Sequence, residues 1–195
     1  MKIKLLIASF IIVMSFVSCE NDAQRIERLF DRSTLLEGIS EDIQYFLDSP
    51  RFRIGINGPQ SRDEMRRMPA FWIEAESEDL VVTFWPLQRE EHEPALYRLQ
   101  VVDVKRETDN YFLGRFIGMT PEQIFRRYPR PPGFQDRPFG ENHIFFQNAD
   151  QSQFIRLWML DNVVIRAAFA YSLGNDGDSP QTGCLFGPAP PPLVD

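Results

Sequence analysis

The sequence predicts an α+β fold in which short helices cover antiparallel β-sheet. Apolar residues recur at three- and four-residue steps between Asn21 and Leu47, which is the spacing of an amphipathic helix. Short runs rich in Val, Ile and aromatic residues follow, and turn-forming residues separate them as in β-hairpins. A segment that begins with glycine and ends with proline occurs at 58–69 and again at 118–129, which indicates tandem helix-plus-antiparallel-sheet modules.

The first predicted element is an N-terminal helical segment, which Gly38-Ile39-Ser40 divides into two pieces and Ser49-Pro50 ends. Two interpretations of this segment are open. One is a spacer or docking helix that lifts the body of the protein off a membrane. The other is an amphipathic helix whose apolar side packs on the first sheet.

The two copies of the repeat align without gaps and share their glycine, two arginines and the final proline. Each copy starts with residues that cap helices, and each ends at a proline, which disfavours helix in the residue before it. Both copies are therefore expected to form short helices. The capping residues are Ser61 and Glu64 in the first copy, and Thr120, Pro121 and Gln123 in the second.

Six β-strands are expected, three after each copy of the repeat. Asp161 and Asn162 suit a two-residue hairpin turn, because both residue types tolerate a positive φ. The strands form either two small antiparallel sheets or one continuous sheet, with helices on one face. Their expected bounds are 71–76, 80–85, 97–104, 142–147, 154–160 and 163–171.

The last part of the chain is predicted to be a disordered, Pro-rich tail. Its prolines, glycines and aspartates bury too little apolar surface to offset the entropy of ordering the segment. The predicted organisation is a signal peptide at 1–18, an anchor and helical segment at 19–50, α+β modules at 51–107 and 108–173, and the tail at 174–195.

The start of the chain has the pattern of an export and lipid-attachment signal. Two lysines precede an apolar run from Leu5 to Val17, which is too short to span a bilayer as a helix of about 20 residues. The ending Phe16-Val17-Ser18-Cys19 resembles a bacterial lipobox, in which the cysteine is acylated and becomes the new N-terminus. The alternatives are a secretory signal cut elsewhere and an uncleaved anchor. With two or more acyl chains, Cys19 is expected to hold the protein stably in a membrane of the bacterial cell envelope, facing the periplasm or the cell surface.

The charge of the chain argues against nucleic-acid binding, and its cysteine content argues against an internal disulfide. The formal net charge is −7, and removal of Lys2 and Lys4 with the signal makes the body more negative. This argues against general nucleic-acid binding, which needs a basic footprint to neutralise phosphates. Of the two cysteines, lipidation of Cys19 leaves Cys184 alone, so no internal disulfide is expected.

No motif predicts a catalytic residue, a metal site or a cofactor. Zinc needs several closely spaced ligands, but His92 and His143 are the only histidines and lie far apart in the sequence. Phosphate-binding, dinucleotide-binding and nucleophile-elbow motifs do not occur. Acidic pairs such as Glu90 and Glu93 keep one alternative open, because glycoside hydrolysis needs only two carboxylates at a suitable separation.

Arginines gather after the second copy of the repeat and form the candidate partner-binding site. Arginine and tyrosine are common interface anchors, and a proline-stiffened loop loses little entropy when it docks. A positive patch of this kind could meet an acidic protein, anionic headgroups or peptidoglycan carboxylates. The competing interpretation is an ordinary exposed loop whose arginines pair with the protein's own acids. The candidate residues are Arg126, Arg127, Tyr128, Arg130 and Arg137.

One motif suggests a family. Gly118-Met119-Thr120-Pro121-Glu122, in a chain that combines a lipobox, a short helix and a three-stranded antiparallel sheet, resembles the SmpA/OmlA-like small lipoproteins and the β-lactamase-inhibitor-protein-like modules. The resemblance covers 52–171 and implies protein binding in the envelope without catalysis. We therefore expect a non-enzymatic binding or scaffold lipoprotein. The alternatives are a hydrolase of envelope glycan or peptide, and a carrier for an apolar ligand that the many phenylalanines would hold.

Overall fold

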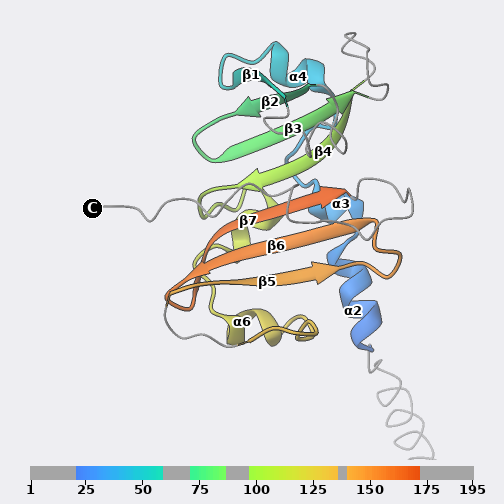
Figure 1. The fold of residues 1–195 in the computed structure, drawn as a ribbon, viewed down its shortest axis with the longest axis vertical. Helices are drawn as coiled ribbons and strands as arrows, with labels where there is room; N and C mark the ends of the chain where they lie inside the picture. Colours follow the sequence, from blue (N-terminus) through green and yellow to red (C-terminus); the bar gives the residue numbers. More distant parts are fainter. Residues whose placement is uncertain (1–20, 59–70, 87–96, 136–139, 172–195) are drawn as a thin grey trace, which may run out of the picture.

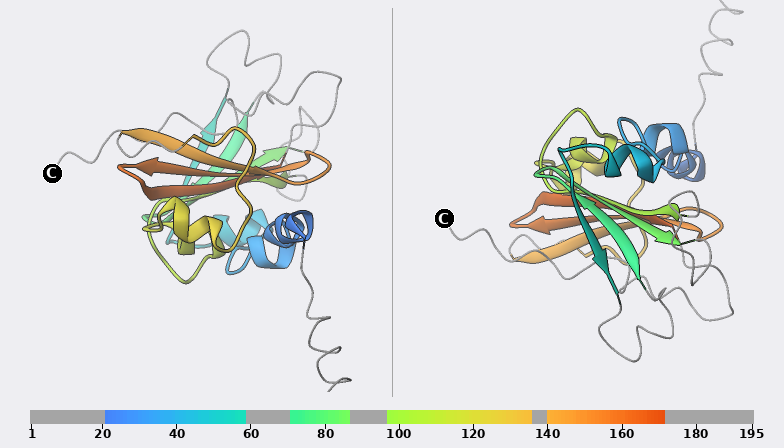
Figure 2. Two further views of the ribbon diagram at one scale, coloured as in Figure 1. Left: turned by 90° about the horizontal axis from the view of Figure 1, so that it is seen from below. Right: turned by 90° about the horizontal axis from the view of Figure 1, so that it is seen from above.

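The computed structural model describes residues 21–58, 71–86, 97–135 and 140–171. These residues form one seven-stranded antiparallel sheet with short helices on one face (Figures 1 and 2). The predicted α+β class is therefore confirmed, with one continuous sheet. The strands are β1 (Arg53–Asn57), β2 (Trp72–Glu76), β3 (Leu80–Pro86), β4 (Tyr97–Val104), β5 (Glu141–Gln147), β6 (Gln153–Leu160) and β7 (Val163–Tyr171).

The sheet consists of two meanders that join in its middle. The strand order is β1-β2-β3-β4-β7-β6-β5, so β1 to β4 form the first meander and β5 to β7 the second. The join is the antiparallel pairing of β4 with β7, from Val101 opposite Ala170 to Val104 opposite Ala167. Figure 1 shows the first meander at one end of the molecule and the second at the other.

The predicted strands agree closely with the observed ones. The bounds of β4 and β7 were predicted to the residue, and those of the other four predicted strands differ by one residue at one end. The hairpin turn at Asp161 and Asn162 is also confirmed, with φ of 48° and 66°. The sequence analysis missed β1, a short strand at the edge of the sheet that carries Gly55 in its middle, where glycine weakens a strand.

Three helices precede β1 within residues 21–58: α2 (Asp22–Leu29), α3 (Arg32–Leu35) and α4 (Ile43–Leu47). The predicted break at Gly38 is confirmed, because this residue has a φ of +77°. A second break was not predicted. It arises because the side chain of Asp31 accepts a hydrogen bond from the backbone of Thr34 and so starts α3 as its N-cap.

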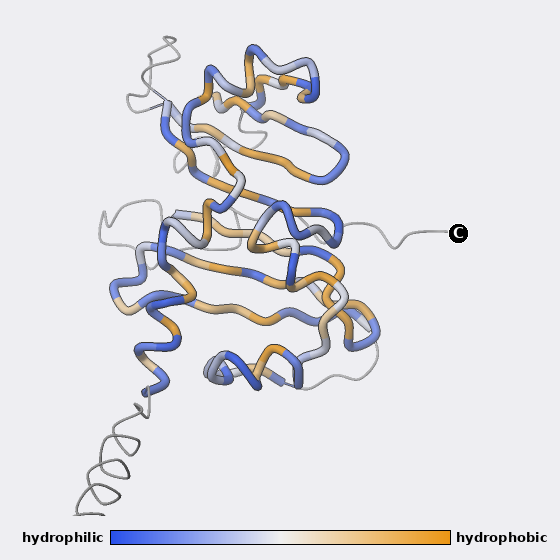
Figure 3. The backbone as a smooth tube through the Cα atoms, turned by 180° about the vertical axis from the view of Figure 1, so that it is seen from behind, coloured by the Kyte–Doolittle hydropathy of each residue, from blue (hydrophilic) through white to orange (hydrophobic). Residues whose placement is uncertain are grey.

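These helices pack on the sheet, as the second interpretation of the segment expected. Phe46 of α4 lies against Phe52 and Phe84, with ring centroids 4.9 and 5.4 Å apart, and covers the first meander. Leu29 of α2 and Leu35 of α3 are buried in the same core. Figure 3 shows apolar residues following the strands, whereas α2 begins with hydrophilic residues.

The helical face of the second meander is covered by the 3-10 helix η2 (Phe112–Phe116) and by α6 (Pro121–Phe125). The predicted start of α6 is confirmed: Thr120 is the N-cap, Pro121 follows, and the side chain of Gln123 accepts a hydrogen bond from the Thr120 backbone at 2.8 Å. Gly118, with φ of +86°, donates its backbone N–H to Val164 at 2.8 Å, which ties this segment to β7.

Several predictions fall on residues outside the described part of the chain. They are the signal peptide at 1–18, the lipidated Cys19, the first copy of the repeat after Gly58, the acidic pair Glu90 and Glu93, and the tail at 174–195. The tandem repeat of modules and the Pro-rich tail therefore stay predictions.

Candidate functional site

The arginines that the sequence singled out begin where α6 ends. Arg126 is the C-cap of this helix, and both Arg126 and Arg127 are exposed. Among the described residues, neither of these two guanidiniums forms an ion pair or a side-chain hydrogen bond. Arg137 lies outside the described residues. Arg126, Arg127 and Arg130 are called the arginine surface below.

A side chain of the N-terminal helix holds this segment in place. Arg25 of α2 donates from Nε to the carbonyl oxygen of Arg127 at 2.9 Å and from Nη2 to that of Arg126 at 3.2 Å. These carbonyl groups follow the last turn of α6. The end of a helix has carbonyl groups without helical partners and a partial negative charge, so a guanidinium there provides both hydrogen bonds and a favourable charge. The contact joins residues about a hundred positions apart and fixes α2 to the arginine surface.

Tyr128 faces inward rather than outward. Its ring centroid lies 5.8 Å from that of Phe116 and 6.2 Å from that of Phe146, so the side chain packs against the main core. Burial raises the pKa of Tyr128, and the nearby guanidiniums of Arg127 and Arg25 oppose this rise. Tyr128 therefore contributes to the site by fixing the backbone between Arg127 and Arg130.

Arg130 is held over two aromatic rings. Its guanidinium carbon lies 5.5 Å from the ring centroid of Phe125 and 5.2 Å from that of Phe134, and these two rings meet edge to face at 5.1 Å. Such cation–π contacts favour a fixed guanidinium position. The loop after α6 is thus anchored by its own side chains as well as by Arg25.

A groove of about 560 Å³ runs beside the arginine surface. Its walls come from α2, from the segment Pro129–Pro132 and from β5 with the turn that follows it. Most of the lining is apolar, and Arg130 is the basic residue among it. The lining residues include Ala23, Ile26, Pro131, Phe145 and Phe146.

Sequence reasoning missed this groove because its walls lie far apart in the chain. Only the folded sheet brings α2 next to β5 and to the loop after α6, as Figure 1 shows. The available signal was the apolar side of α2 at Ile26, which lines the groove instead of being fully covered.

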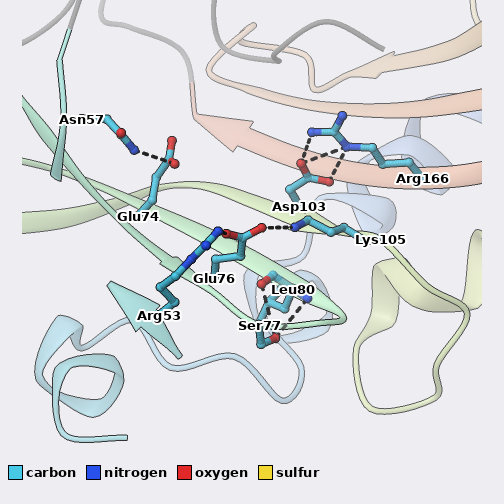
Figure 4. A network of polar contacts seen from close by, with 9 residues as sticks. All are labelled: Arg53, Asn57, Glu74, Glu76, Ser77, Leu80, Asp103, Lys105 and Arg166. Atoms are coloured by element: carbon cyan, nitrogen blue, oxygen red, sulfur yellow. Dashed lines mark hydrogen bonds and ion pairs between the residues drawn. The ribbon is translucent and has the colours of Figure 1, made fainter. Parts of the chain in front are cut away.

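A second group of polar residues crosses the other face of the sheet (Figure 4). On the first meander, Glu76 forms ion pairs with Arg53 and with Lys105, the latter at 2.6 Å. Hydrogen bonds from Lys105 and Arg53 lower the pKa of Glu76 below its ordinary value. All three side chains are partly or largely exposed, so the group is a solvated ion-pair network, which contributes little stability.

The join between the meanders carries a buried ion pair. Arg166 of β7 donates from Nε to both carboxylate oxygens of Asp103 of β4, at 2.8 and 2.9 Å, and Asp103 is only 6% exposed. The guanidiniums of Arg166 and Arg156 lie 4.6 and 4.9 Å from the ring centroid of Trp158. These contacts link β4, β7 and β6. They do not line the groove, so we assign them a structural role.

The described residues hold no group of three or more histidine, cysteine or carboxylate side chains that could bind a metal ion. His143 is an exposed residue of β5, whereas His92 lies outside the described part of the chain. In that described part, no helix is long and apolar enough to cross a membrane.

Comparison of the chain with models of known protein families, with curated proteins and with solved structures found no significant match.

Proposed function

We propose that this chain is a lipid-anchored protein of the bacterial cell envelope, held in a membrane through Cys19, that acts as a non-enzymatic binding or scaffold protein. It binds an envelope protein or another anionic envelope component through the arginine surface, and Arg137 belongs to the same candidate set from the sequence. The observation that carries the proposal is the pair of exposed guanidiniums, Arg126 and Arg127, beside an apolar groove with fixed walls.

Rigidity supports a binding role for this surface. Docking costs free energy when loops and long side chains must be ordered, and a surface that is already fixed loses less. The Arg25 hydrogen bonds and the stacking of Arg130 fix the backbone in advance. Arginine also suits carboxylate and phosphate groups, since its planar guanidinium can donate two parallel hydrogen bonds.

The finer organisation of the chain belongs to the same proposal. The two meanders derive from tandem helix-plus-sheet modules, and residues 174–195 form a flexible Pro-rich tail. Support for the modules comes from the confirmed helix start at Thr120 in the second copy and from the division of the sheet into two meanders. We also propose that the chain is related to the SmpA/OmlA-like lipoproteins, which its sequence resembles at Gly118–Glu122.

Cross-linking in native membranes tests the binding role. The lipidated protein is cross-linked, purified and analysed by mass spectrometry beside a Cys19→Ala variant. We expect anionic envelope components that depend on both the anchor and the arginine surface. The arginine-surface variant, with Arg126, Arg127 and Arg130 all changed to Gln, should lose them while it keeps its fold.

A control variant that removes the same number of arginines elsewhere tests whether binding depends on their position or only on the total charge. The distal arginine variant changes Arg51, Arg53 and Arg106 to Gln, which removes three exposed cations from the first meander. It should recover the same components as the unaltered protein. Equal recovery by both variants would eliminate the arginine surface as the binding site. The hydrolase alternative would be favoured by a glycan- or peptide-hydrolysing activity that is lost when Glu90 and Glu93 are changed to Gln.

A further inference from the structure

We propose that the arginine surface lies against the bilayer that holds the lipid anchor and binds anionic phospholipid headgroups there. The inference rests on the proposed lipidation of Cys19 and names the anionic component that the arginine surface meets. It follows from the length of the tether, from the attachment of α2 to the body and from the position of the exposed arginines.

The tether between the anchor and the folded body is very short. α2 starts with a capping box, in which the Asn21 side chain accepts a hydrogen bond from the Gln24 backbone at 2.8 Å and the Gln24 side chain accepts one from the Asn21 backbone at 3.2 Å. The first described residue, Asn21, lies two positions after Cys19. Two residues reach at most about 7 Å, so an acylated Cys19 holds the start of α2 at the headgroup layer.

α2 cannot move away from the body to relieve this constraint. Arg25 is hydrogen-bonded to the two carbonyl groups after α6, and Glu27 accepts a hydrogen bond from the Ala149 backbone at 3.2 Å. Leu29 is 1% exposed and Phe30 is 5% exposed, so the end of the helix is fixed in the core. The sheet therefore moves with α2, and the anchor keeps the end of the sheet beside the start of α2 close to the bilayer.

This orientation brings the second meander to the membrane. Figure 1 shows the start of α2, the helix α6 and the edge strand β5 at one end of the molecule, with β1 at the opposite end. The two edge strands are separated by the full width of the sheet, which is roughly 30 Å at a strand spacing of about 4.8 Å. The anchor thus selects one edge of the sheet as the membrane-facing one.

Charge decides what the arginine surface meets at that position. Arg126 and Arg127 are exposed without an ion pair among the described residues, although the acidic residues Asp22, Glu27 and Glu122 also lie at this end. Asp22 lies 3.7 Å from Arg25, which balances its charge. Attraction to anionic headgroups acts over about a Debye length, and the two exposed guanidiniums are suited to bidentate contact with phosphate.

Reconstitution of the full lipidated protein into vesicles tests the inference. Vesicles contain phosphatidylcholine alone or together with phosphatidylglycerol, and a trace of lipid with a quencher on its headgroup. A fluorophore is attached to cysteine in either a Gln135→Cys or an Ile56→Cys variant, both with Cys184→Ser. Gln135 is an exposed residue of the loop after α6, and Ile56 is 74% exposed on the distal strand β1.

We expect quenching of the probe at position 135 and none at position 56. Phosphatidylglycerol should increase the quenching at position 135, and added salt should remove that increase because it screens the charges. The arginine-surface variant should lose the phosphatidylglycerol-dependent part of the quenching, whereas the distal arginine variant should retain it. Equal quenching at the two positions, or a phosphatidylglycerol effect that the arginine-surface variant retains, would overturn the inference.

Two further readouts separate this inference from the proposed function. The mass of the purified N-terminal peptide reports acylation of Cys19, and an unmodified cysteine would overturn the lipoprotein proposal together with the inference. An acylated protein whose arginine-surface variant loses a cross-linked acidic protein, with unchanged quenching at position 135, would overturn the inference alone and leave the binding role in place.

Discussion

The two meanders have the same antiparallel arrangement but are stabilised differently. The first meander buries apolar residues mainly on its helical face, where Phe46 meets Phe84, and carries a solvated ion-pair network on the other face. The second meander buries apolar residues on both faces, with Phe154 and Trp158 on the face away from the helices. The difference indicates that the first meander depends mainly on the layer of contacts under the helices, with Val101 of β4 buried on the other face, whereas the second meander has a cluster on each face.

The largest expected effect on stability comes from removing an aromatic ring between the first meander and its helices. Phe46→Ala should lower the free energy of unfolding by about 3–5 kcal/mol, because a fully buried ring is replaced by a cavity. Chemical denaturation of the variant beside the unaltered protein measures it. Phe154→Ala makes the matched change in the second meander, and two separate unfolding transitions in either variant would contradict one cooperative sheet.

The join between the meanders should be nearly as sensitive. Asp103→Ala removes the carboxylate from the partly buried guanidinium of Arg166, which should cost up to about 3 kcal/mol, because breaking a fully buried pair typically costs about 3–5 kcal/mol. Glu78→Ala serves as the control, because its ion pair with Arg106 is largely exposed and contributes at most about 1 kcal/mol. Similar losses for the two variants in denaturant titrations would show that the buried pair does not hold the meanders together.

A pair of glycines distinguishes steric from conformational constraint. Gly38 and Gly140 both have positive φ, +77° and +78°. A Cβ at Gly38 would overlap the carbonyl oxygen of Asn110, whereas a Cβ at Gly140 meets nothing within 4 Å. Gly140→Ala should cost about 1 kcal/mol for the left-handed backbone alone, and Gly38→Ala clearly more. Thermal unfolding measures both, and equal shifts would contradict the close contact.

The smallest effect concerns pH and the network on the first meander. Hydrogen bonds from Lys105 and then Arg53 lower the pKa of Glu76 below its ordinary value of 4.5. The stabilisation is therefore present above that value and is lost as pH falls through the lower pKa of the folded state. Glu76→Gln should remove less than about 1 kcal/mol at neutral pH, since the group is partly exposed, and should flatten the acid limb of a stability profile. A steeper acid limb would contradict this assignment.

Local patterns in the sequence predicted most of the fold. The alternation of apolar residues marked the strands, and Thr120-Pro121 with Gln123 marked the start of α6, because each signal acts within a few residues. The break at Asp31 was missed because its capping hydrogen bond competes with a helical pattern that continues through it. β1 was missed because it has only five residues with Gly55 in the middle, so its apolar alternation is short and interrupted.

The candidate site was predicted less completely, because it depends on long-range contacts. The sequence identified Arg126, Arg127 and Arg130 as a basic cluster, but it gave Tyr128 the same surface role, and this ring packs against Phe116 and Phe146. Neither the groove nor the link from Arg25 could be inferred, since both require α2 to lie beside a segment that follows it by about a hundred residues.

The position of β7 has a consequence for the order of folding. Among the described strands it is the last to be synthesised, yet it lies between β4 and β6 in the middle of the sheet. Until Tyr171 has emerged, β4 and β6 each present an open edge with unpaired backbone groups, which is the form of a sheet most prone to wrong pairing. A chain that ends just before Val163 has the first meander with an open edge at β4 and only two strands of the second, and the nine-residue strand β7 joins the two parts.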